Sequence, residues 1–122
     1  MTKILDIQQS IIAANGNTSL AKELFTMLLT DLAVRLKQIE DSYQSKNMES
    51  LAEHIHKLYG ATAYCIVPKL RHCTEILEEK LRKKDYSDIN KFVDNVHHEI
   101  QQLIQYGPEF IENDWIESEL EA

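Results

Sequence analysis

The 122-residue sequence has few of the residues that break a chain into short strands and turns. Only three glycines and two prolines occur in it, and a turn-rich β fold needs more of both. Its two cysteines, Cys65 and Cys73, are too few for a disulfide framework. These shortages argue against an all-β domain and a disulfide-stapled scaffold, and they favour a reduced intracellular compartment.

Long apolar runs and positive charge are scarce too. No stretch reaches the roughly 18 consecutive apolar residues of a membrane-spanning helix, and residues 1–6 lack the apolar core of a signal peptide. The formal net charge is −7, whereas non-specific binding to nucleic acid or to an anionic membrane surface needs a basic footprint. We therefore expect a soluble, cytoplasmic chain without direct contact to nucleic acid or membrane.

Helix-forming residues are abundant, and apolar ones recur at helical spacing. The longest apolar stripe predicts a helix near residues 20–43, with Thr18 or Ser19 as its N-cap. A short helix within residues 4–12 precedes it and ends near Gly16. The long stripe consists of Leu20, Leu24, Met27, Leu28, Leu32, Leu36, Ile39 and Tyr43.

Three more helices are predicted after this one. Asn47 is expected to cap a third helix that reaches about Tyr64. Pro68 suits the first turn of a fourth helix, where its missing N–H costs nothing. The fourth helix ends in basic residues that complement the helix dipole. A fifth helix follows Ser87 or Asp88, either of which can cap it.

Four long amphipathic helices joined by short links predict an all-α fold. We expect an antiparallel up-and-down four-helix bundle with an additional short N-terminal helix. The chain forms a single domain over residues 1–122, with the bundle core at about 4–106. Gly107-Pro108 is expected to end the fifth helix. The acidic tail, residues 107–122, then forms either a short amphipathic helix docked on the bundle or a frayed end.

Helical geometry singles out His56 among the five histidines. At roughly 100° per residue it lies about 130° from the centre of the apolar stripe, on the outer face of the third helix. Its neighbours on that face are Ala52, Gly60 and Ala63. Glycine inside a helix costs about 1 kcal/mol relative to alanine, and three small residues leave a clearing that a partner's active site can approach.

An exposed imidazole is a good nucleophile at neutral pH in its neutral form. The small residues around His56 can therefore mean that a group is transferred to this histidine. They can also mean that His56 is an ordinary surface histidine whose neighbours are small by chance. The geometry alone leaves both interpretations open.

The run His56-Lys57-Leu58-Tyr59-Gly60 resembles the H-x-L-K-G signature of histidine-containing phosphotransfer (HPt) domains. Residues 51–60 and 67–70, together with the pair Leu77-Glu78, are similar to the HPt module of BarA/GacS-type hybrid sensor histidine kinases. The resemblance covers about residues 4–106 and leaves the acidic tail outside it. It implies a four-helix bundle in which the histidine carries a phosphoryl group.

The resemblance implies a phosphorelay intermediate without autonomous catalysis. A response-regulator receiver domain would dock on the third helix, the imidazole would attack its aspartyl phosphate through Nε2, and a second receiver would take the group. The receiver would supply Mg²⁺, so no cofactor is expected on this chain, which has nothing resembling a kinase ATP site. Receiver docking or phosphate support is expected from Ala52, Lys57, Tyr59, Gly60, Ala63, Lys69 and Arg71.

The resemblance also implies a monomer that works in the cytoplasm, as a cytoplasmic domain of a membrane-anchored sensor kinase. Two positions depart from the family pattern. Tyr59 stands where the family often has lysine, so its hydroxyl, or Lys69 or Arg71 from the next helix, would have to steady the phosphoryl oxygens. Ile66 stands where the family often has glycine, which puts the geometry of that turn in question.

Two other classes of function remain as alternatives. One is a non-catalytic helical protein-interaction module in which His56 is incidental. The other is a bundle with a metal site, which the spacing of the histidines gives little support. His54 points to another helix face than His56, the His97-His98 pair is expected in solvent, and His72 with Cys73 lacks a zinc-binding spacing. No metal ligand is therefore predicted, and both cysteines are expected to be small core residues.

Overall fold

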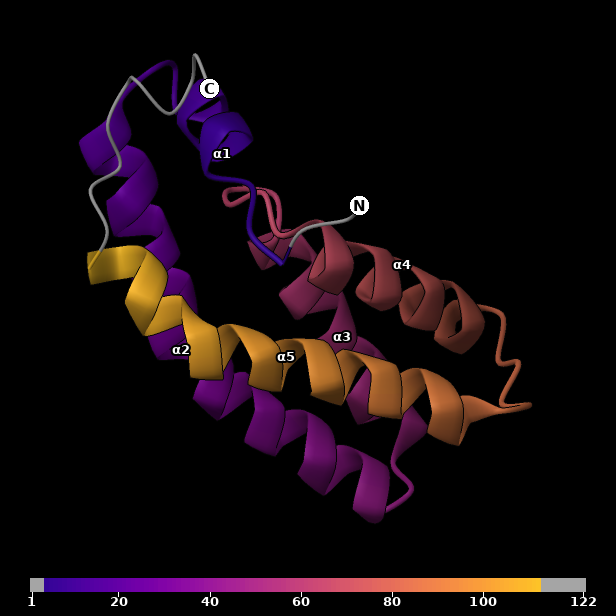
Figure 1. Ribbon diagram of the computed structural model, residues 1–122. Coiled ribbons are helices and arrows are strands. Elements are labelled where there is room, and N and C mark those ends of the chain that lie inside the picture. Colours follow the sequence, from indigo (N-terminus) through magenta and orange to yellow (C-terminus); the bar gives the residue numbers. More distant parts are fainter. Residues whose placement is uncertain (1–3, 113–122) are drawn as a thin grey trace.

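The computed structural model describes residues 4–112, and this part of the chain forms five α-helices and no strand. They are α1 (Ile7–Ala13), α2 (Thr18–Gln44), α3 (Met48–Ala61), α4 (Pro68–Arg82) and α5 (Ile89–Glu112). Helices α2 to α5 form a closed ring in which each contacts two neighbours, and α1 packs against α2 (Figure 1). The predicted four-helix bundle with a short N-terminal helix is confirmed.

Helices α1, α2 and α3 each begin after a residue whose side chain caps the N-terminus. Asn47 accepts a hydrogen bond from the backbone N–H of Ser50 at 3.0 Å, as predicted, and Pro68 occupies the first turn of α4. The predicted cap of α2 is wrong, because the side chain of Asn17 accepts from the N–H of Leu20 at 2.9 Å. Helix α1 begins at Ile7 rather than within residues 4–6, since Asp6 is its N-cap.

Helix α3 is shorter than predicted. It ends at Ala61, and Thr62 is its C-cap, with a hydroxyl that donates to the carbonyl oxygen of Tyr59 at 2.6 Å. The link to α4 is held by the N-terminal segment: Asp6 N–H donates to the carbonyl oxygen of Ile66 at 2.8 Å, and Ile66 N–H donates to Ser10 Oγ at 3.1 Å. Both backbone polar groups of Ile66 are thus hydrogen-bonded to the N-terminal segment.

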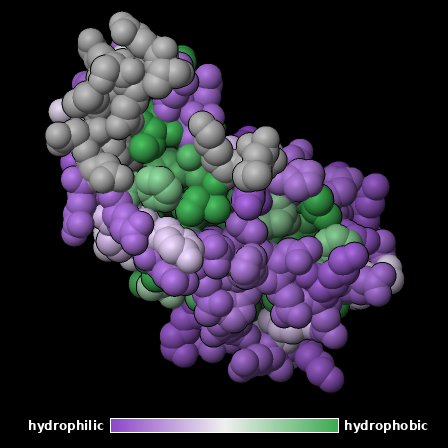
Figure 2. Space-filling model, viewed as in Figure 1, coloured by the Kyte–Doolittle hydropathy of each residue, from purple (hydrophilic) through white to green (hydrophobic). Residues whose placement is uncertain are grey.

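The core runs along the axis of the bundle. Its largest fully buried side chains come from every helix: Ile11, Phe25, Leu32, Ile39, Leu51, Ile55, Leu58, Leu70, Leu77, Ile100 and Leu103. On the face shown in Figure 2, hydrophilic side chains cover most of the surface, and apolar surface gathers beside α1, with a smaller patch over α4. Within residues 4–112, no helix is both long enough and apolar enough to cross a membrane.

The prediction that Gly107-Pro108 ends the fifth helix is wrong. Helix α5 continues to Glu112 with Pro108 inside it. The reason lies in packing, since Phe110 meets Phe25 edge-on with ring centroids 6.3 Å apart, and Ile111 also packs against the core. Such apolar burial opposes the roughly 3 kcal/mol cost of an interior proline. The rest of the predicted tail, residues 113–122, lies outside the described part.

Gly107 marks a close approach between α5 and α2. A Cβ atom there would lie 2.4 Å from Leu29 Cδ1 and 2.7 Å from Leu29 Cδ2, whereas a Cβ at the exposed Gly60 meets nothing within 4 Å. We expect Gly107→Ala to lower the free energy of unfolding by about 1–2 kcal/mol through overpacking. The matched change Gly60→Ala should raise it by about 0.5–1 kcal/mol. Urea unfolding measures both, and equal stabilisation by the two changes would contradict this packing.

Candidate functional site

Helix α3 presents His56 to solvent. Leu51, Ile55 and Leu58 of the same helix are completely buried, and these positions fix the rotation of α3 about its axis. The His56 side chain is 75% exposed as a result. The predicted outer-face position of this histidine is confirmed.

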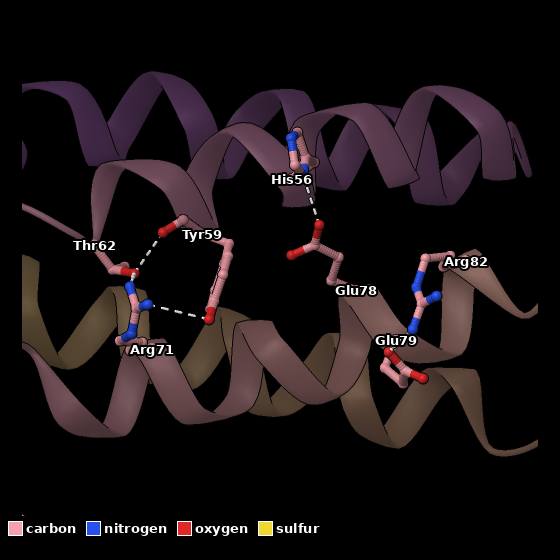
Figure 3. A network of polar contacts seen from close by, with 7 residues as sticks. All are labelled: His56, Tyr59, Thr62, Arg71, Glu78, Glu79 and Arg82. Atoms are coloured by element: carbon pink, nitrogen blue, oxygen red, sulfur yellow. Dashed lines mark hydrogen bonds and ion pairs between the residues drawn. The ribbon is translucent and has the colours of Figure 1, made fainter.

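The neighbouring helix α4 contributes a carboxylate to His56. Glu78 Oε1 lies 2.5 Å from His56 Nδ1, and the Glu78 side chain is only 26% exposed (Figure 3). An ionised carboxylate can only accept, so this contact places the imidazole proton on Nδ1. The lone pair of the neutral ring is then on Nε2, which is therefore the nucleophilic nitrogen.

The role of Glu78 could not be found from the sequence. It lies 22 residues after His56, and the contact depends on the register in which α3 and α4 pack. The buried neighbours Leu77 and Thr74 fix that register on the α4 side. The sequence pointed to Glu78 only through the apolar–acidic pair Leu77-Glu78, and this pair does not predict which residue the acid contacts.

Tyr59 and Arg71 contact each other rather than His56. The Arg71 guanidinium donates to the Tyr59 hydroxyl at 3.1 Å and to Thr62 Oγ1 at 3.0 Å, and it lies 4.4 Å from the centre of the Tyr59 ring (Figure 3). This network ties the C-terminal end of α3 to the first turns of α4. In this arrangement, neither the hydroxyl nor the guanidinium faces the imidazole as a phosphate support.

The two lysines named from the sequence also lie apart from the imidazole. Lys57 Nζ is 3.7 Å from Glu53 Oε1 on the same helix, and both side chains are exposed. Lys69 lines a cleft between α4 and α5 together with His72 and other residues. Within residues 4–112, the structure gives His56 one polar partner, Glu78.

The small-residue clearing is narrower than the sequence suggested. Gly60 is exposed and lies one helical turn after His56, with open space where a side chain would begin. Ala63 is exposed but lies beyond the end of α3, and Ala52 is half-buried against the core. Gly60 alone therefore keeps the outer face of α3 flat next to the histidine.

A groove also lies between α2 and α3. It encloses about 780 Å³. Three large side chains along it are exposed, namely Met27 at 59%, Val34 at 58% and Tyr64 at 67%. Lys57 lines the groove as well, so part of α3 forms one of its walls.

The remaining histidines have different surroundings. His54 is half-buried, as predicted for a residue at the core boundary. His97 is half-buried as well, and its Nε2 lies 3.2 Å from Glu40 Oε1 on α2, so its predicted place in solvent is wrong. His98 is exposed. Within residues 4–112, no group of three or more histidine, cysteine or acidic side chains is arranged to hold a metal ion.

Burial disfavours the thiolate form of both cysteines. Burial raises the pKa of the Cys65 thiol to about 11. Burial and, to a smaller extent, the nearby Glu99 carboxylate raise the pKa of the Cys73 thiol to about 12. The thiolate is the nucleophilic form of cysteine, so burial disfavours nucleophilic chemistry at both side chains. Cys65 is fully buried, as predicted, and Cys73 is half-buried.

Comparison with known proteins shows which family the chain resembles. A model of the Hpt domain matches residues 23–106. The chain is 35% identical over 78 residues to the histidine-protein kinase BarA of Escherichia coli, a match that covers 64% of this chain and 8% of BarA. It is 31% identical over 101 residues to the sensor histidine kinase GacS of Pseudomonas protegens, covering 83% of this chain and 11% of GacS. The chain thus spans about a tenth of the length of these relatives.

A solved structure shows the same fold. The HPT domain of a hybrid histidine kinase from Shewanella superimposes with a TM-score of 0.83 at 23% sequence identity. The match covers 98% of this chain and 97% of that domain. The arrangement of the helices is therefore shared over nearly the whole length.

Proposed function

The chain belongs to the Hpt domain family, and on that basis we propose that it is a phosphorelay intermediate. It accepts a phosphoryl group on His56 from the aspartate of a receiver domain and passes it to a response regulator. The observation that carries this proposal is the exposed imidazole whose Nδ1 is bound to Glu78, because Nε2 is thereby left as the free nucleophile.

The chemistry needs little from this chain beyond a positioned nucleophile. Nε2 of His56 forms a bond to phosphorus while the bond between phosphorus and the aspartate oxygen breaks. The receiver supplies Mg²⁺ and most of the stabilisation of the transition state. Onward transfer reverses these roles with a second aspartate. The chain is therefore a phosphocarrier, without catalysis of its own.

The receiver docks on the outer face of α3 and on the groove between α2 and α3. The groove exposes Met27, Val34 and Tyr64, and Lys57 on α3 lies along its wall. Exposed apolar patches of this kind are typical of protein interfaces. Gly60 allows the backbone of the receiver to come close beside the imidazole.

The relatives are sensor kinases. We infer that the chain serves such a kinase on the cytoplasmic side, as its phosphotransfer domain, and that it acts as a monomer. Its net charge of −7 suits a protein partner better than nucleic acid or an anionic membrane.

Phosphorylation by a small donor tests this function directly. The purified chain is incubated with phosphoramidate and read by intact-protein mass spectrometry. We expect one acid-labile phosphoryl adduct, and peptide mapping should place it on His56. If neither phosphoramidate nor a phosphorylated receiver modifies the chain, the proposal is wrong and the protein-interaction module is the better hypothesis.

A further inference from the structure

Arg71 differs from the other two arginines of the chain in its charge partners. Those two pair with acidic side chains on their own helices. Arg71 lies in the first turns of α4 and is half-buried, and among the described residues it forms no ion pair with an acid. A positive charge that the fold itself does not pair is available to a partner.

Neutral groups of α3 hold the Arg71 guanidinium in one orientation. Nη1 donates to Thr62 Oγ1 at 3.0 Å, and Nη2 donates to the Tyr59 hydroxyl at 3.1 Å. The central carbon of the guanidinium lies 4.4 Å from the centre of the Tyr59 ring. These contacts use two of the five N–H donors, and none of them neutralises the charge. A planar guanidinium that is already ordered matches the two oxygens of a carboxylate.

The pair of Arg71 and Tyr59 lies close to the histidine along the bundle. Tyr59 follows His56 by three residues, so it stands on the next turn of α3, about 4.5 Å further along the helix axis. Figure 3 shows the pair on the same seam between α3 and α4 as His56 and Glu78. A protein interface of standard size covers about 800 Å² of each partner, which is much more than one turn of helix. A receiver that reaches the imidazole therefore also reaches this seam.

We propose that Arg71 is a docking residue that binds an acidic side chain of the receiver, and that Tyr59 positions its guanidinium. This inference rests on the proposed function of His56. The net charge of −7 repels an acidic partner at long range. A fixed cation near the histidine therefore marks the place where a carboxylate is accepted. Arg71 acts in binding, and the phosphoryl group passes only through His56.

Transfer from a phosphorylated receiver to the wild type and to Arg71→Gln tests this proposal. Loss of a charged hydrogen-bond donor should lower the second-order rate constant at least about tenfold. The loss should appear as a higher receiver concentration at half-maximal rate, with the maximal rate nearly unchanged. Added salt should slow the wild type more steeply than the variant. Arg71→Lys keeps the charge without the planar fork, so it should recover the salt dependence and only part of the rate.

Tyr59→Phe tests the positioning role. Phenylalanine keeps the ring against the guanidinium but lacks the hydroxyl that accepts from Nη2. Alone, this change should slow transfer about threefold to fivefold. Added to Arg71→Gln, it should slow transfer no further, because the two residues act through one contact. Losses that multiply in the double variant would overturn the role given to Tyr59.

Lys91→Gln is the matched control for the change in charge. Lys91 is exposed on α5, a helix that does not contact α3, so this variant should keep the wild-type rate. Equal losses in Arg71→Gln and Lys91→Gln would show a general charge effect and overturn the proposal.

Two further measurements distinguish docking from other roles of Arg71. Slower phosphorylation of Arg71→Gln by phosphoramidate would show that the guanidinium acts on the phosphoryl group, and it would overturn the docking role. A lower maximal rate together with a lower melting temperature would overturn it in favour of a structural role. Failure of the wild type itself to form a phosphohistidine would instead overturn the proposed function.

Discussion

Replacing His56 with glutamine is expected to abolish acceptance of a phosphoryl group from a phosphorylated receiver. The glutamine amide is similar in length to the imidazole but has no nucleophilic lone pair on nitrogen. The side chain is 75% exposed, and exposed substitutions usually change the free energy of unfolding by less than about 0.5 kcal/mol. The loss should therefore appear in a fully folded protein. Intact-protein mass spectrometry after incubation with the receiver measures it.

His54→Gln is the matched control for this change. His54 lies two residues away on the same helix, is half-buried, and points to a different side of α3. Its replacement should keep transfer in the folded fraction, even if the melting temperature falls. Phosphorylation that persists in His56→Gln would move the chemistry to another residue. Loss of transfer in a folded His54→Gln variant would point to His54 as that residue.

Gly60→Arg should separate phosphorylation from docking. The position is exposed, a Cβ atom added there would meet nothing within 4 Å, and arginine is a better helix former than glycine by about 1 kcal/mol. The fold should therefore be kept or slightly stabilised. The new side chain stands one helical turn from His56 and prevents the close approach of a receiver. Since small misplacements of reacting groups cost about a hundredfold in rate, transfer from the receiver should fall by at least that factor.

Two comparisons make this result specific. Phosphoramidate is small, so Gly60→Arg should still accept a phosphoryl group from it at nearly the wild-type rate. Gly60→Ala adds only a methyl group and should keep most of the transfer from the receiver. Equal receiver rates for the arginine variant and the wild type would show that the partner does not approach this face of α3.

Local features of the sequence determined the helices and the face on which the histidine lies. The periodic apolar residues predicted all five helices, since a helix of this composition is stable only with its apolar face buried. The same periodicity placed His56 outside, because Leu51, Ile55 and Leu58 on its own helix must face the core. The family motif around His56 lies within one helix and could be read without any tertiary contact.

Contacts between helices were decided only by the tertiary structure. The bond from Glu78 to His56, the pairing of Arg71 with Tyr59 and the approach of Gly107 to Leu29 each join two helices. The spacing of residues within a helix says which side chains share a face, but not which turn of the next helix lies opposite. That register is set by how the buried side chains of all four helices interlock. The same packing explains why α5 continues beyond Pro108, although local propensity alone predicted that the helix ends there.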